Sequence, residues 1–217
     1  MFEILLTACL ASDLANCRTE RLPGGETLAE CRAAARIGAA GFPPHLEVQS
    51  FPCTLAGEEP AFSISQIAPG IFVHKGQHAI PDRQNLGDVS NMGFIIGRDG
   101  VMVVDSGSTR KIGDRLLAAI RQETDLPVTH VVLTHAHPDH IYGTGGLLID
   151  APLVIGHERH KEALQSRGDA YREAMSRMLG DGFEGSVGVA PGRLIDAVSE
   201  IDLGDRIVEL RPHRTSH

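Results

Sequence analysis

Short apolar runs separated by turn residues predict that much of this chain forms β-strands joined by tight connections. Two pairs of runs flank the turn sequences Ala68-Pro69 and Arg98-Asp99-Gly100, which predicts antiparallel neighbours. The predicted strands cover residues 2–8, 46–53, 62–67, 70–74, 91–96, 101–105, 128–134, 153–156, 199–203 and 206–210. From residue 62 onward these strands are regular enough to indicate one sheet.

Helices are predicted between several of these strands. Ile112, Leu116 and Ile120 recur every four residues and share one face, which predicts a helix over 108–123 with Ser108 as its N-cap. Further helices are predicted over residues 26–40, 139–147 and 158–179. Strands and helices therefore mix in an α+β arrangement.

All four cysteines lie in the first quarter of the chain, at Cys9, Cys17, Cys31 and Cys53. No two of them form a Cys-x-x-Cys pair, which disfavours a structural zinc site. Two disulfides formed in an oxidising compartment are one interpretation, and buried free thiols are the other. The connectivity stays open; a nested arrangement would join Cys9 to Cys53 and Cys17 to Cys31.

The cysteine-containing segment has a different pattern from the regular strands that follow it. A Gly-Glu-Glu-Pro stretch at 57–60 stands between the two parts and is typical of a boundary. We therefore expect a small N-terminal α/β unit over 1–57 and a larger domain over 58–217.

Composition and charge exclude several functions. The chain has 20 Lys plus Arg against 28 Asp plus Glu, a formal charge of −8, and no basic run that could follow a phosphate backbone, so a nucleic-acid partner is not expected. No apolar run approaches the roughly 18–20 residues that cross a bilayer. Residues 1–10 are mostly apolar, but Glu3 stands where a signal peptide has basic residues, so a strand is the better interpretation. A small-molecule substrate fits this composition, and the oligomeric state is left open.

The strongest chemical signal is the sequence Thr134-His135-Ala136-His137-Pro138-Asp139-His140. Three imidazoles and a carboxylate within six residues, at the end of an apolar strand, are unfavourable unless a metal ion binds them. Neutral imidazole and carboxylate oxygen are both preferred zinc ligands. His135 and His137 can point the same way from an extended segment, while Pro138 turns the chain so that Asp139 and His140 face another point. One loop can therefore supply two metal positions.

This loop resembles the His-x-His-x-Asp-His signature of the metallo-β-lactamase superfamily. Val103-Val104-Asp105-Ser106-Gly107 is similar to the strand of that family that ends in Asp-x-Gly, and the resemblance covers about residues 62–217. It implies a partial αββα sandwich, with Asp105 beside the metal site as a hydrogen-bonding residue. The cysteine-bearing N-terminal unit and residues 91–97 further resemble the zinc metallohydrolases of periplasmic quinoprotein relay systems.

The resemblance also implies the metal ligands. His135 and His137 would bind the first zinc, and Asp139 and His140 the second. A third histidine for the first zinc should follow a later strand, and His217 stands at that position. The family pattern also has a further Asp or Cys and a last histidine beyond this point, so the C-terminal portion of the domain is expected to be missing. We therefore expect up to two Zn²⁺ in the complete domain and one in this chain.

The implied activity is hydrolysis of a carbonyl ester, thioester or amide by a zinc-bound hydroxide that Asp139 orients, which makes Asp139 the expected catalytic residue. The implied location is periplasmic or secreted, in a quinoprotein-associated pathway, and the same pattern implies little or no activity for this shortened chain. Alternatives are a non-catalytic metal-binding or interaction module, a class B β-lactamase, or a glyoxalase II-like enzyme. His157 and His160 lie three apart at a helix start, and we expect both to be solvated.

Overall fold

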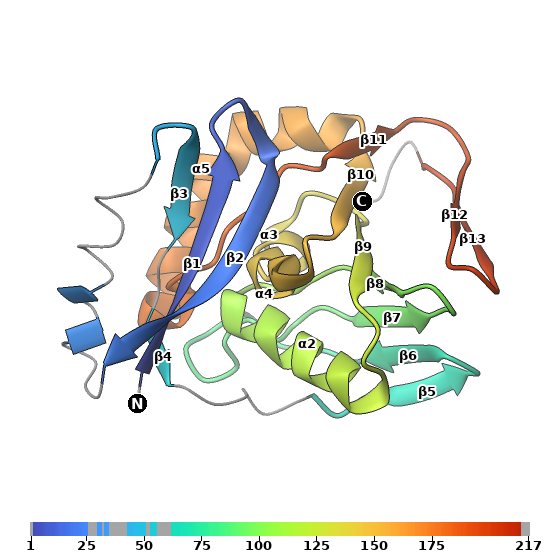
Figure 1. Cartoon of the computed structure of the whole chain (residues 1–217), viewed down its shortest axis with the longest axis horizontal. Coiled ribbons are helices and arrows are strands. Elements are labelled where there is room, and N and C mark those ends of the chain that lie inside the picture. The colour runs from blue at the N-terminus through green and yellow to red at the C-terminus, as the bar shows by residue number, and fades with distance from the viewer. Residues whose placement is uncertain are drawn as a thin grey trace.

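The computed structural model describes residues 2–25, 30–31, 33–34, 43–50, 53–55 and 62–213 (Figure 1). Its main element is a seven-stranded sheet with the order β11-β10-β9-β8-β7-β6-β5. The strands are β5 (Ser65–Ala68), β6 (Ile71–His74), β7 (Met92–Ile96), β8 (Val101–Val104), β9 (Val128–Leu133), β10 (Leu153–His157) and β11 (Arg193–Ile195). Neighbours are antiparallel from β5 to β8 and parallel from β8 to β11. The carboxyl ends of β8, β9 and β10 therefore meet at one edge.

One face of the sheet is covered by helices. These are α2 (Arg110–Glu123), α3 (Pro138–Ile141), α4 (Thr144–Leu147) and α5 (Arg159–Leu179), with 3-10 turns η1 (Leu148–Asp150) and η2 (Gly180–Phe183). Ile112, Leu116 and Ile120 are fully buried, as their spacing predicted. The N-cap of α2 is Thr109, whose side chain accepts a hydrogen bond from the Ile112 N–H, and the prediction of Ser108 was wrong by one residue. No helix in the described ranges is long and apolar enough to cross a membrane.

The opposite face of the sheet is covered by a hairpin of β12 (Ser199–Asp202) and β13 (Ile207–Leu210). Met102, Val132 and Ile155, one from each central strand, pack there against Ile201 and Leu203. The adjacent residues Val103, Val131 and Val154 belong to the core on the helical face, because side chains alternate along a strand. This mixed arrangement, with a helical layer and a β layer on the two faces of the sheet, confirms the predicted α+β class.

The N-terminal unit forms a separate four-stranded sheet of β1 (Phe2–Leu10), β2 (Asp13–Gly25), β3 (Leu46–Ser50) and β4 (Cys53–Leu55). β1 pairs antiparallel with the other three strands. The sequence did not predict β2, whose residues do not alternate clearly between apolar and polar types. Most of the helix predicted over 26–40, and the domain boundary predicted after residue 57, lie outside the described residues.

The strand register tests the nested cysteine pairing. Cys17 lies opposite Cys9, whereas Cys53 lies opposite Ile4, five residues farther along β1. Five residues of strand span about 17 Å, and a disulfide requires Cα atoms within about 7 Å. The proposed Cys9–Cys53 bond is therefore wrong.

Glycines bring the helical layer close to the segment that follows the histidine loop. A Cβ atom at Gly113 of α2 would lie 1.9 Å from the carbonyl oxygen of Gly143. A Cβ atom at Gly143 would in turn lie 1.9 Å from the carbonyl oxygen of Ser106. Two backbone segments that approach this closely leave no room for a side chain, so α2 fixes the position of the loop between α3 and α4.

This contact predicts opposite effects for two Gly→Ala substitutions in helices. Alanine normally stabilises a helix interior by about 1 kcal/mol relative to glycine. Gly168→Ala in α5, where no atom lies within 4 Å of the added Cβ, should show that gain. Gly113→Ala should instead lower the free energy of unfolding by about 1–3 kcal/mol or more, because the new methyl group overlaps backbone. Urea unfolding of both variants measures this, and equal stabilisation by both would contradict the packing.

Candidate metal centre

The candidate site is assembled where three parallel strands end. Asp105 follows β8, the histidine loop follows β9, and His157 is the last residue of β10. Because the carboxyl ends of neighbouring parallel strands share an edge, segments far apart in sequence converge there. This position explains why the polar groups of three separate segments meet.

Asp105 links the first two of these segments. Its buried carboxylate accepts hydrogen bonds from the backbone N–H of Thr134 at 2.8 Å and from the Thr134 hydroxyl at 2.8 Å. The same carboxylate accepts from Nδ1 of His140 at 2.8 Å. Asp105 has a φ of +60°, an unfavourable conformation for a residue with a side chain, and these bonds hold it there. The family resemblance implied that Asp105 forms hydrogen bonds beside the site, and the structure gives His140 as one of its partners.

The bond from Asp105 decides which nitrogen of His140 remains for other partners. Nδ1 faces Asp105, so Nε2 is directed to Asp139, whose Oδ2 lies 3.3 Å away. A carboxylate that holds the second nitrogen of a histidine in this way fixes its tautomer and orientation. Asp139 and His140 therefore present one oxygen and one nitrogen to the same point.

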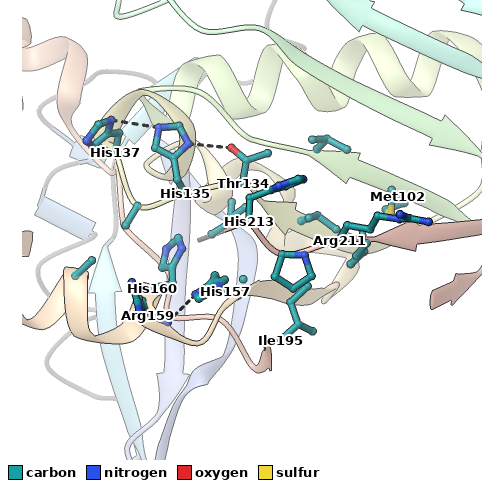
Figure 2. Close-up of a pocket in the computed structure, with 18 of the residues that line it drawn as sticks. Met102, Thr134, His135, His137, His157, Arg159, His160, Ile195, Arg211 and His213 are labelled. Carbon is teal, nitrogen blue, oxygen red and sulfur yellow. Dashed lines mark hydrogen bonds between the residues drawn. The ribbon is translucent and has the colours of Figure 1, made fainter. Parts of the chain in front are cut away.

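His135 and His137 form a second donor pair. Nδ1 of His135 lies 3.0 Å from the Thr134 hydroxyl, and Nε2 of His135 lies 3.2 Å from Nδ1 of His137 (Figure 2). The rings of His135 and His140 are adjacent, with centroids 4.1 Å apart. The loop thus places two donor pairs side by side.

The spacing of the donors fits zinc. With bonds of about 2.0–2.1 Å, two ligands of a tetrahedral zinc ion lie roughly 3.3 Å apart. The pairs measure 3.2 Å for His135 with His137 and 3.3 Å for Asp139 with His140. Within the described part of the chain, no three His, Cys, Asp or Glu residues converge on one point. His217, the expected third ligand of the first zinc, lies outside the described residues.

Charge couples the members of the Asp139–His140 pair. Burial lowers the pKa of His140, but its bonds to Asp105 and Asp139 outweigh this effect and raise the pKa to about 9. Burial raises the pKa of Asp139, and the contact with His140 more than offsets it, so the pKa of Asp139 is below its usual value. Without a metal ion, a protonated His140 therefore balances the carboxylates.

The sequence failed to identify His160 as part of the site. It was expected to be solvated, but only 3% of it is exposed, and neither ring nitrogen has a hydrogen-bond partner among the described residues. Burial lowers its pKa to about 4, and the nearby His135 adds to this effect. His157 is half-buried, and its Nδ1 accepts from the backbone N–H of Arg159 at 3.1 Å. The available signal was the position of His160, which follows β10 as the histidine loop follows β9.

A pocket of about 690 Å³ opens beside the first donor pair, His135 and His137. His135 and His137 form one part of its wall, and α5 contributes His160 (Figure 2). Val104 and Val132 of the sheet and Leu210 of β13 make another part apolar. A small organic molecule can therefore lie against the sheet while it reaches His135 and His137.

The pKa of His140 predicts how the stability of the metal-free protein depends on pH. Its folded pKa of about 9 exceeds the ordinary 6.5, so the stabilisation is fully present below pH 6.5 and is lost as pH rises through 9. The free energy of unfolding should fall over this interval by about 3 kcal/mol at most. Urea unfolding with a chelator at about pH 6 and about pH 9.5 measures the fall. His140→Asn should abolish this fall in the free energy of unfolding. His78→Asn, a substitution at an exposed position, should leave the fall unchanged. An undiminished fall in His140→Asn would show that another group is responsible.

Comparisons with known proteins agree with this architecture. The family model of the metallo-beta-lactamase superfamily matches residues 86–217. A linear primary-alkylsulfatase from Pseudomonas sp. is 33% identical over 61 residues, which are 28% of this chain and 12% of that protein. The chain thus matches only a small part of this relative's length.

Two solved structures show the same fold. A stereoselective inverting sec-alkylsulfatase from Pseudomonas sp. matches with a TM-score of 0.50 and 20% identity, over 69% of this chain and 27% of that one. A metallo-beta-lactamase from Pontibacter korlensis matches with a TM-score of 0.50 and 15% identity, over 68% of this chain and 58% of that one. Because the family model covers more than half of the sequence, the chain belongs to the metallo-beta-lactamase superfamily.

Proposed function

We propose that this protein is a zinc-dependent hydrolase of a carbonyl ester, thioester or amide. The observation that carries this proposal is the pair of donor separations, 3.2 Å and 3.3 Å, which fit two neighbouring zinc positions, the first of them at the wall of a pocket. Membership of a superfamily that consists mostly of hydrolases supports it. We therefore assign the pocket to a small-molecule substrate.

In this proposal, His135 and His137 hold the first zinc ion, and Asp139 and His140 hold the second. When bound, zinc supplies a Lewis acid that polarises the substrate carbonyl and activates water near neutral pH. Asp139 has the catalytic role, because its carboxylate is paired with His140, lies near His135 and can accept a hydrogen bond from the attacking water. Asp105 acts through His140, whose ring it orients.

Sulfate esters are a second candidate substrate class. The specific observation is the similarity to two alkylsulfatases, one in sequence and one in structure. A class B β-lactamase and a glyoxalase II-like thioesterase use the same loop and remain alternatives within the hydrolase proposal. A non-catalytic metal-binding or interaction module is the alternative outside it, and it differs by binding zinc without turnover.

Substitution of the first donor pair tests the hydrolase proposal. The full-length protein should bind zinc and hydrolyse at least one of nitrocefin, a thioester or an aryl sulfate. His135→Asn and His137→Asn should each lower the zinc content and reduce kcat/KM at least about 100-fold, because each removes a direct ligand. Zinc analysis of the dialysed protein and initial rates measure both quantities.

Two outcomes decide between the alternatives. His78→Asn, which removes an exposed histidine elsewhere, should leave zinc content and rate unchanged. A chain that binds no zinc would refute the proposal. Full zinc binding without hydrolysis of any of the three substrates would favour the non-catalytic module.

We further propose that the protein is periplasmic or secreted, in a quinoprotein-associated pathway, and that its cysteines form disulfides. The support is the cysteine-containing sheet, in which the register places Cys9 opposite Cys17. Residues paired across antiparallel strands have Cα atoms about 4.5–5.5 Å apart, within the range that a disulfide spans.

This proposal predicts a Cys9–Cys17 bond in protein purified from an oxidising compartment. Peptide mapping by mass spectrometry without reduction should recover the two cysteine-containing peptides as one linked species. Recovery of both as separate alkylated peptides would contradict the prediction. The pairing does not depend on zinc, so a chelator should leave the linked species unchanged.

A further inference from the structure

His160 is a buried polar group for which the described part of the chain provides no hydrogen-bond partner. Only 3% of the residue is exposed, and neither Nδ1 nor Nε2 has a hydrogen-bond partner within the described ranges. A buried polar group without a partner destabilises the folded state. Such a group in a native structure indicates a role that the protein alone does not satisfy.

The position of the ring directs it to the pocket. His160 is the second residue of α5 and lines the same cavity as His135 and His137 (Figure 2). Its Nδ1 would lie 3.3 Å from a Cβ atom at Gly156, so the glycine at this point of β10 makes room for the ring. His160 therefore lies against Gly156 of β10 and shares the pocket wall with His135 and His137.

Other side chains of α5 continue this surface. Arg167 and Tyr171 follow His160 by seven and eleven residues, which places all three on one face of the helix, and all three line the pocket. The ring of Tyr171 meets that of His137 edge to face, with centroids 6.3 Å apart. This face of α5, defined by His160, Arg167 and Tyr171, is hereafter the α5 face.

The charges around the pocket favour an anion. Arg159, Arg167 and Arg211 are among its lining residues, whereas Glu209 is the single carboxylate among the described lining residues. Glu209 forms an ion pair with Arg211, and no carboxylate of the described residues forms an ion pair with Arg167. The amino end of the 21-residue helix α5 adds a partial positive charge at His160.

We propose that the α5 face binds an oxyanion of the substrate, a carboxylate or a sulfate. The substrate bond that is cleaved then lies beside His135 and His137. This inference rests on the proposed function and adds the substrate class: a small organic ester, thioester or amide that carries a negative charge. A ring N–H of His160 donates a hydrogen bond to the oxyanion, and the Arg167 guanidinium supplies the opposite charge at the pocket rim.

The binding of three benzene derivatives tests the subsite without turnover. Benzoate and benzenesulfonate carry the two oxyanions, and benzamide is the neutral control of similar shape. Isothermal titration of the intact chain in the presence of a chelator should show binding of at least one anion and at least about tenfold weaker binding of benzamide. The anion that binds with the higher affinity identifies the favoured oxyanion. Equal affinity for all three compounds would refute the proposal.

Two matched pairs of variants locate the binding. Arg167→Gln should weaken binding of the favoured anion about tenfold, whereas Arg172→Gln, which removes an exposed arginine of α5 outside the pocket, should not. His160→Leu should weaken it similarly, and His160→Gln, which retains an N–H donor, should restore part of it. Unchanged affinity in both Arg167→Gln and His160→Leu would overturn the assignment.

Thermal unfolding separates this role from a structural one. Because His160 is buried without a partner, His160→Leu should raise the melting temperature by about 2–4 °C. A lowered melting temperature would show that the imidazole stabilises the fold and would count against the proposal. The zinc content of His160→Leu should equal that of the unsubstituted protein; a loss of zinc would make His160 a metal ligand and would likewise overturn the oxyanion role.

The experiment separates this inference from the hydrolase proposal. Anion binding is measured with a chelator present, so it can succeed in a chain that never hydrolyses a substrate. His135→Asn, which tests the zinc site, should keep the preference for anion over benzamide. Loss of zinc and loss of anion binding are therefore independent results.

Discussion

A buried carboxylate, that of Asp105, joins the end of one strand to the loop that follows the next. It accepts hydrogen bonds from the backbone and hydroxyl of Thr134 and from Nδ1 of His140. The first two fix where the histidine loop leaves β9, and the third fixes which nitrogen of His140 faces Asp139. Both donor pairs therefore depend on one side chain that need not touch a metal ion. This dependence also accounts for the left-handed backbone at Asp105, since the bonds it makes offset the strain.

Close backbone packing supports this arrangement from the helical side. Gly143 donates its N–H to the carbonyl oxygen of Gly107, and its Cα lies too close to Ser106 to carry a side chain. The segment after the histidine loop is thus held against the segment that begins at Asp105. Because both segments also pack against α2, the ends of β8 and β9 cannot shift independently. The histidine loop is therefore fixed in two ways: by hydrogen bonds at the edge of the sheet and by backbone packing against α2.

The sequence predicted those parts of the structure whose signal is local. The apolar spacing of α2 and the runs of β7, β8 and β9 are decided by nearby residues, and the predicted elements agree with the structure within a few residues. The histidine loop was recognisable because its donors lie within six residues of one another. β2 and β11 were missed because their register is set by pairing with strands distant in sequence, and their own residues do not alternate clearly.

His160 was missed for a related reason. A histidine near the start of a polar helix is usually solvated, and only the parallel pairing of β9 with β10 brings this one beside the donor pairs. The burial of His160 is then a tertiary effect: Gly156 lets the ring sit against β10, and α5 turns it inward. The site thus combines a strained Asp105, a charged His140 and an unpartnered His160 at one edge of the sheet. The backbone strain at Asp105 and the burial of His160 are unfavourable for folding, whereas the charge on His140 is stabilised by the carboxylates beside it. His160 lines the pocket together with His135 and His137, where a ligand can supply the hydrogen bond that it lacks among the described residues.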